Sequence, residues 1–371
     1  MRKMRAIMKK VGTTFTLIAL VTACQTTSTP PPTTVATEAP TRVILVIADG
    51  AGAGHWAALR LVVDRPAVED FAATGLVDTR GADHILTGSA ASATAYAIGK
   101  RTYFGAQGVG PDSMPAPSVL SVAEDRGMST GVVSTTTISD ATPAAFIAHT
   151  TRRTALGAGR QFAASGVDVI MGGGRELFTQ VARDGKPPIL ESLLSTHAYI
   201  TSEQELDALD LPATDRLLGL FAERDMALAP ERSPALDRMV EVALEILDRN
   251  PAGFFLLVEN EETDTQAHRN EPFDVIAREM LALDDAIRVV VAYQDRHPET
   301  LIVVTADHET GGMSLTVDST GAPRAAYNTT GHTAELVPIF ANGPGAAAFG
   351  RMLANERVGQ LLLEHVGRQS P

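Results

Sequence analysis

The sequence predicts an α/β protein, a three-layer sandwich in which a largely parallel central sheet is flanked by helices. Short runs of Val, Ile and Leu recur along the chain, which is typical of strands buried on both faces. Stretches with helical periodicity lie between several of these runs. Carboxylates and imidazoles follow the runs, at the strand ends where α/β folds gather their functional groups.

The apolar runs are expected to form six strands. They cover residues 42–49, 129–137, 167–174, 253–260, 300–307 and 336–343. The clearest helical periodicity covers residues 235–249 and 272–294, where apolar residues recur every three to four positions. Residues 175–234 are less regular, and we expect loops and short helices there, over one end of the sheet.

The first 41 residues differ from the rest in composition. Residues 1–23 are typical of a secretory signal, because five basic residues precede an apolar run too short to span a membrane. Cys24, the only cysteine of the chain, follows VTA as in a bacterial lipobox. Residues 25–41 are rich in Thr and Pro and cannot bury enough apolar surface to fold. We therefore expect export, a lipidated Cys24 with a tether over residues 24–41, and one folded domain over 42–371.

The net charge limits the partners. Without residues 1–23 the chain has 26 basic and 44 acidic residues, a formal charge of −18. This excess disfavours nucleic acid or an anionic lipid surface as a partner. It leaves room for a small anionic substrate where bound cations reverse the local field.

Acidic residues and histidines at the predicted strand ends form a candidate metal centre. Asp264 and His268 are one helical turn apart and would share a face. Asp307 and His308 are adjacent where a strand ends. Either pair alone is more typical of a surface ion pair or an exposed loop, but several such strand ends together favour zinc, which takes mixed Asp and His ligands. The whole set is Asp49, Asp264, His268, Asp307, His308 and His332.

The pattern resembles the alkaline phosphatase family, in the family's order, over residues 42–345. VIADGAG is similar to its first metal motif, and GSAASATAY to its nucleophile segment. SDATPAAFIAHTTRR resembles the stretch that carries a third-metal group and a phosphate-binding arginine. VENEETDTQAH, TADHETGG and TTGHT resemble the remaining metal motifs. The resemblance implies an alkaline phosphatase-like version of the sandwich, with residues 42–371 as a single catalytic domain.

The resemblance also implies two zinc ions and one magnesium ion. One zinc would be held by Asp264, His268 and His332. The other would be held by Asp49, Asp307 and His308, with Ser89 at its open position. A third site would use the oxygens of Asp49, Thr142 and Glu259, with Asp140 just outside it, and such hard ligands favour magnesium.

By the same resemblance Ser89 is the nucleophile, and a metal takes the place of a general base. The stretch around Ser89 does not read G-x-S-x-G, as a nucleophile elbow would, and a bound divalent cation strongly lowers the pKa of a hydroxyl. The small residues after Ser89 are expected to form a helix whose N-terminus faces the phosphate. Arg153 would clamp two phosphate oxygens, and its spacing from the Asp-Ala-Thr-Pro motif favours it over Arg152. Ser92 is expected to pack inward.

The implied activity is hydrolysis of small phosphate monoesters through a phosphoserine on Ser89. The zinc of Asp264, His268 and His332 would stabilise the leaving alkoxide and then supply the hydroxide of the second step. A phosphodiesterase of the same superfamily is the alternative, although an arginine clamp suits a terminal phosphate. A non-catalytic binding protein is a further alternative, and both a monomer and a homodimer stay open.

Three positions depart from the family pattern near the phosphate. Gly88 stands where the family's familiar bacterial member has an aspartate that holds the arginine, so we expect a more mobile Arg153 and looser phosphate binding. Thr265 replaces a larger, often basic residue that contacts phosphate indirectly, and Asn260 replaces a common glycine. These changes concern phosphate affinity and turnover rather than metal binding.

Overall fold

Six apolar runs of the sequence form the middle of a ten-stranded sheet in the computed structural model, which describes residues 42–181 and 185–367. The strand order is β14-β2-β13-β8-β1-β7-β3-β4-β6-β5. The six strands predicted from the sequence are β1 (Arg42–Ala48), β3 (Ser129–Thr137), β4 (Val169–Gly173), β7 (Phe254–Asn260), β8 (Thr300–Thr305) and β13 (Val337–Asn342). The four further strands are β2 (Ala73–Asp78), β5 (Ala198–Ile200), β6 (Leu217–Leu220) and β14 (Met352–Ala354). The prediction of a largely parallel α/β sheet is confirmed.

Strand direction brings the predicted functional residues to one edge of the sheet. β13 is antiparallel to its neighbours β2 and β8, and the other pairs are parallel. β1 lies between β7 and β8, with Ile47 beside Glu259 on one side and Thr305 on the other. The carboxyl ends of these three strands therefore meet, and the residues that follow them lie close together.

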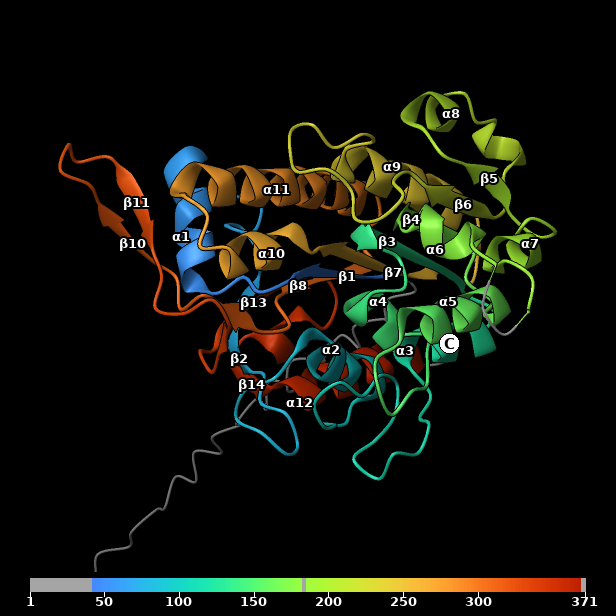
Figure 1. Cartoon of the computed structure of the whole chain (residues 1–371), viewed down its shortest axis with the longest axis horizontal. Helices are drawn as coiled ribbons and strands as arrows, with labels where there is room; N and C mark the ends of the chain where they lie inside the picture. Colours follow the sequence, from blue (N-terminus) through green and yellow to red (C-terminus); the bar gives the residue numbers. More distant parts are fainter. Residues whose placement is uncertain (1–41, 182–184, 368–371) are drawn as a thin grey trace, which may run out of the picture. The chain divides into compact units, whose positions relative to one another are not determined.

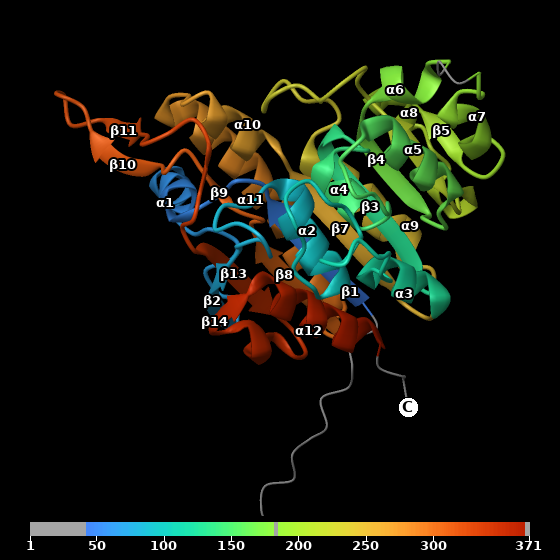
Figure 2. The same cartoon turned by 60° about the horizontal axis from the view of Figure 1, so that its bottom comes forward.

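Helices cover both faces of the sheet, as the sandwich prediction requires. Helices α9 (Leu236–Leu247) and α11 (Phe273–Arg296) lie side by side on one face (Figure 1). Helices α2 (Ser89–Ile98), α3 (Val119–Asp125) and α12 (Asn355–Gly367) cover the other (Figure 2). The remaining helices are α1 (Ala53–Val62), α4 (Ala141–Ala145), α5 (Ala155–Ala164), α6 (Arg175–Thr179), α7 (Ile189–Leu193), α8 (Glu203–Asp207), α10 (Glu262–His268) and the 3₁₀ turns Leu211–Ala213 and Ala346–Phe349.

The region 175–234 is more regular than the sequence suggests. It contains the short helices α6, α7 and α8 as predicted, but β5 and β6 also extend the sheet beyond β4. Two small antiparallel pairs lie outside the main sheet: β10 (Ser314–Val317) with β11 (Pro323–Ala326), and β9 (Glu309–Thr310) with β12 (His332–Thr333). The second pair matters for the site, because it carries His332 to the strand end of β8.

The predicted signal, Cys24 and the tether lie outside the described residues. Within residues 42–181 and 185–367, no helix is both long enough and apolar enough to cross a membrane.

Candidate active site

Asp49, Asp307 and His308 form one cluster at the carboxyl ends of β1 and β8, and we name it the Asp49 cluster. His308 Nε2 lies 3.5 Å from Asp49 Oδ1 and 3.3 Å from Asp307 Oδ2. All three side chains are buried. Asp49 Oδ1 and Asp307 Oδ2 are buried without a hydrogen-bond partner among the described residues. Buried carboxylate oxygens without donors are costly unless a cation faces them, so this cluster fits a metal ion.

Asp264, His268 and His332 form a second cluster beside the first, the Asp264 cluster. His268 Nε2 lies 3.2 Å from Asp264 Oδ2 and 3.1 Å from His332 Nε2. His332 Nε2 is 3.8 Å from Asp264 Oδ1. His308 adjoins both clusters, because its ring stacks on that of His332 with the ring centroids 3.6 Å apart. The predicted sets of metal ligands thus converge as two adjoining clusters.

Backbone carbonyls orient the two histidines of the Asp264 cluster. His268 Nδ1 is 2.6 Å from the carbonyl oxygen of Thr330, and His332 Nδ1 is 2.7 Å from that of Thr87. A carbonyl only accepts, so each Nδ1 carries the proton. In the neutral form each Nε2 then keeps a lone pair, and the two lone pairs face each other and Asp264. This is the arrangement in which histidine binds a metal ion.

The third predicted group is oxygen-only, as the sequence implies. Thr142 Oγ1 lies 3.5 Å from Asp49 Oδ2. Glu259, at the end of β7, accepts a hydrogen bond from Ser134 of the neighbouring strand β3. Both Thr142 and Glu259 are buried. Carboxylate and hydroxyl oxygens in this arrangement suit a hard cation such as magnesium.

Several carboxyls of the site are held away from their ordinary charge state. Burial raises the pKa of Glu259 to about 8. Burial and the nearby charges of Asp307 and Asp264 raise the pKa of Asp49 well above its usual range. The hydrogen bond to Asp264 raises the pKa of His268 to about 9, against the effect of partial burial. Because burial and neighbouring carboxylates disfavour the charged forms of Glu259 and Asp49, a bound cation would stabilise these carboxylates in their ionised state.

Ser89 faces the Asp49 cluster from the first position of helix α2. Its Oγ lies 3.1 Å from His308 Nε2. Gly88 is the N-cap of α2 and has no side chain, so no side-chain cap accepts a hydrogen bond from the first backbone N–H groups of this ten-residue helix. Every later residue of α2 is buried, and the run of small side chains lets the helix lie close to the clusters. The predicted helix is confirmed, and it starts at Ser89.

A pocket of about 180 Å³ joins these groups. It is lined by Asp49, Gly88, Ser89, Ala90, Phe104, Gly105, Asp140, Arg153, Glu261, Asp264, His268 and His332. Arg153 therefore reaches the same pocket as Ser89, as predicted, and its guanidinium forms an ion pair with Asp140. Ser92, the competing serine, is fully buried and accepts a hydrogen bond from Asn355, which leaves it out of the pocket.

The sequence interpretation missed several groups around the pocket. Glu261 lines it, and burial raises the pKa of this carboxyl to about 9. Thr265, one of the departures from the family pattern, donates to Glu261 Oε1 at 2.6 Å. Thr310 donates to Asp264 and lies 3.2 Å from His308 Nδ1. Phe104 lines the mouth with its ring two-thirds exposed. The adjacent acidic residues of VENEETD were the available signal for Glu261.

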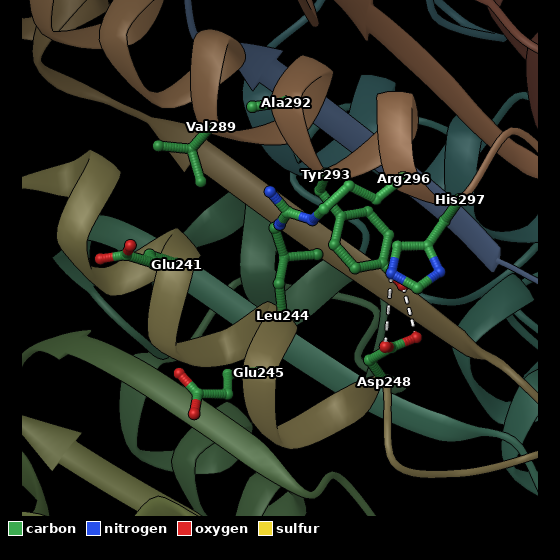
Figure 3. A pocket seen from close by; sticks show the side chains of 9 residues that line it. All are labelled: Glu241, Leu244, Glu245, Asp248, Val289, Ala292, Tyr293, Arg296 and His297. Atoms are coloured by element: carbon green, nitrogen blue, oxygen red, sulfur yellow. Dashed lines mark hydrogen bonds and ion pairs between the residues drawn. The ribbon is translucent and has the colours of Figure 1, made fainter.

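A larger pocket, of about 440 Å³, lies away from these groups between α9 and α11 (Figure 3). Its central carboxylate, Asp248, accepts a hydrogen bond from Tyr293 at 2.6 Å and lies 3.6 Å from His297 Nε2. Arg42, at the start of β1, also donates to Asp248, which puts this pocket at the opposite edge of the sheet from Asp49. Its lining contains no serine, threonine or cysteine, and the hydroxyl of Tyr293 is engaged by Asp248.

Two adjoining Asp/His clusters, with a serine hydroxyl against one and an arginine in the same pocket, fit an α/β enzyme that binds metal ions beside a serine. The sequence model described as alkaline phosphatase matches residues 41–323. The chain belongs to the alkaline phosphatase family.

Relatives extend the match to nearly the whole domain. The chain is 34% identical over 312 residues to the repressible alkaline phosphatase of Saccharomyces cerevisiae, covering 73% of this chain and 55% of that one. It is 32% identical over 415 residues to the streptomycin-6-phosphate phosphatase of Streptomyces griseus, covering 88% and 90%. The chain thus spans little more than half of the yeast relative and most of the bacterial one.

A solved structure of the family has the same fold. The alkaline phosphatase of the Antarctic bacterium TAB5 superposes with a TM-score of 0.82 at 29% identity, covering 90% of this chain and 99% of that one. A variant of that enzyme has been solved with magnesium bound in its M3 site. Two groups of side chains, Asp49, Asp307 and His308 and the group Asp264, His308 and His332, have ligand atoms within 4.8 Å of one another. Together with the related structure, they support metal cofactors in the present chain.

Proposed function

We propose that the protein is an alkaline phosphatase that hydrolyses small phosphate monoesters with Ser89 as the nucleophile. The observation that carries the proposal is the position of Ser89 Oγ, 3.1 Å from His308 in a pocket that also holds Arg153. A phosphoryl group bound there would contact the nucleophile, the arginine and the edge of both clusters at once. Such convergence is what positioning and electrostatic stabilisation of a phosphoryl transfer require.

The residues present fit two zinc ions and one magnesium ion. Asp264, His268 and His332 would hold one zinc, and Asp49, Asp307 and His308 the other. Asp49, Thr142 and Glu259 would hold magnesium, with Asp140 just outside that site. When bound, these ions would lower the pKa of the serine hydroxyl and neutralise charge that develops on the phosphate oxygens.

The chain's own groups then divide the work. Ser89 Oγ would attack phosphorus in line with the ester oxygen, and the phosphoserine formed would be hydrolysed by water in a second displacement. The N-terminus of α2 points its partial positive charge at the phosphate. Arg153 would bind two non-bridging oxygens through its planar fork. Ser89 itself is fixed because the rest of α2 is buried.

The test is hydrolysis of p-nitrophenyl phosphate by the purified protein at pH 8 to 10. We expect EDTA to abolish activity, zinc and magnesium together to restore it, and Ser89→Ala to lose it. Bis-p-nitrophenyl phosphate, assayed in parallel, separates a phosphodiesterase from a monoesterase. A folded, metal-loaded protein that cleaves the diester faster, or cleaves neither, would overturn the proposal.

Export and anchorage through lipid on Cys24 are part of the same proposal. They rest on the sequence of residues 1–41 alone. Mass spectrometry of the mature N-terminus, in the wild type and in Cys24→Ser, would detect a diacylglyceryl-modified first residue. A mature chain that begins elsewhere with an unmodified Cys24 would refute it.

A further inference from the structure

The phosphate-facing arginine is anchored at its backbone but not by packing of its side chain. Arg153 precedes Thr154, the N-cap of α5, and its backbone N–H donates to the carbonyl of Gly105 at 2.9 Å. Its side chain is half exposed. Within the described residues, the ion-pair partner of the guanidinium is Asp140. The direction in which the guanidinium points therefore depends on this carboxylate.

Asp140 is placed so that its carboxylate is available for this purpose. It is the N-cap of α4, where an aspartate commonly accepts a hydrogen bond from the helix, yet it makes no side-chain cap hydrogen bond. Pro143, at the third helical position, has no N–H to offer. The backbone of Asp140 is fixed on both sides, because its N–H donates to Thr137 at 2.7 Å and its carbonyl accepts from Ala144 at 3.0 Å.

The position before the nucleophile provides no second carboxylate. Gly88 has no side chain, and a Cβ built there would lie 3.0 Å from Cε2 of the Phe104 ring. Phe104 thus occupies the space over Gly88 at the mouth of the pocket. Gly88 alone predicts a mobile Arg153, but the ion pair with Asp140 restrains the guanidinium.

We propose that Asp140 is a positioning residue that holds Arg153 at the phosphate pocket. This inference rests on the proposed function. Arginine has five N–H donors, so one edge can stay on Asp140 while others reach phosphate oxygens. A guanidinium that is already oriented loses less conformational entropy when phosphate binds. Because the pair is partly exposed, with side-chain exposures of 50% and 25%, the effect is moderate rather than large.

The test measures inorganic phosphate binding to the purified, metal-loaded protein by calorimetry. We expect Asp140→Asn to raise the dissociation constant of phosphate about fivefold to tenfold, which is less than the full effect of one hydrogen bond to a charged group because the pair is partly exposed. Since the effect passes through Arg153, Asp140→Asn should change nothing further in an Arg153→Ala background. Asp207→Asn, which removes one of the two carboxylate partners of Arg238 elsewhere on the surface, is the control and should bind phosphate as the wild type does.

Two results would overturn the inference. One is the same weakening by Asp140→Asn with and without Arg153. The other is a loss of bound magnesium in Asp140→Asn that accounts for the weakening, which would leave Asp140 with a role at the third metal site alone. Because phosphate binding is measured without turnover, an enzyme inactive on monoesters would count against the proposed function and still answer this question.

Discussion

Replacing Thr310 with valine is expected to weaken zinc binding about tenfold to a hundredfold while the fold persists. Thr310 is fully buried in β9 and its hydroxyl touches both clusters. The hydroxyl donates to Asp264, because a carboxylate only accepts. Its lone pair then faces His308 Nδ1, 3.2 Å away, and fixes the proton there. His308 Nε2 is thereby left free to face Ser89 and the Asp49 cluster.

The magnitude follows from these two contacts. Valine has the same β-branched shape as threonine but no hydroxyl, so both hydrogen bonds are lost while a side chain of similar size fills the space. A hydrogen bond to a charged group contributes about 1.5–3 kcal/mol, and 1.4 kcal/mol is a factor of ten. The loss of one such bond from Asp264, with a less well-defined His308 tautomer, gives the stated range. Both proposed zinc sites should be affected, since the hydroxyl contacts Asp264 of one and His308 of the other.

The assay is zinc affinity by competition with a chromophoric chelator, together with the melting temperature of the metal-free protein. Thr130→Val is the matched control, because Thr130 is also fully buried and donates to a carboxylate, that of Glu124 at 3.2 Å, but from the opposite end of the sheet. We expect both variants to melt a few degrees lower and only Thr310→Val to lose zinc affinity. Zinc affinity within twofold of the wild type in Thr310→Val would refute the reasoning.

Three further predictions concern the same site. The metal-free protein should lose stability as pH rises from 6.5 to 9. In the folded state the pKa values of Glu259 (about 8) and His268 (about 9) lie above their ordinary values of 4.5 and 6.5. The folded state therefore binds more protons than the unfolded state, and the stability that these protons contribute is lost as they dissociate. Urea midpoints of EDTA-treated protein at pH 6 and pH 9 check this, and an unchanged or higher midpoint at pH 9 would contradict it. Gly88→Asp should tighten inhibition by inorganic phosphate several-fold, more so with Phe104→Ala, because the ring of Phe104 lies 3.0 Å from the new Cβ; equal inhibition constants would count against a role for this position. Ser92→Ala should lower the melting temperature by a few degrees, because the hydrogen bond from Asn355 is lost, and should keep turnover within twofold. Ser89→Ala should lower turnover at least a hundredfold. Equal losses of turnover in the two variants would mean that the nucleophile has been misassigned.

The middle of the sheet could be predicted because strands buried on both faces carry uninterrupted apolar residues. RVILVIA and TLIVVT are such runs, and they form β1 and β8. β14 and β5 could not be predicted in this way, because each has three residues and mixed burial at an edge of the sheet. The pattern of a buried strand is absent where only part of a strand is buried.

The same limit applies to the site. Asp49 and Asp307 could be assigned to strand ends from the sequence, but their proximity depends on β1 and β8 being neighbours, which no local pattern states. The contacts that orient His268 and His332 come from the carbonyls of Thr330 and Thr87. A carbonyl oxygen is present at every residue, so its role depends on the folded path of the chain and has no signature in composition or spacing.

The site divides into a rigid part and an adjustable part, and this division explains where the chain departs from its family. Asp307, His308 and the helix behind Ser89 are buried, and this burial would keep the proposed metal ligands in place, where small shifts would weaken binding. Arg153 is half exposed, and a group that must grip a phosphate and then release it benefits from such freedom. Gly88 and Thr265 lie next to Phe104 and Glu261, which line the pocket, and neither is one of the proposed metal ligands. Changes there can alter phosphate affinity and the rate of product release without disturbing the metal centre, so this part of the pocket is where the chain's own substrate preference would be set.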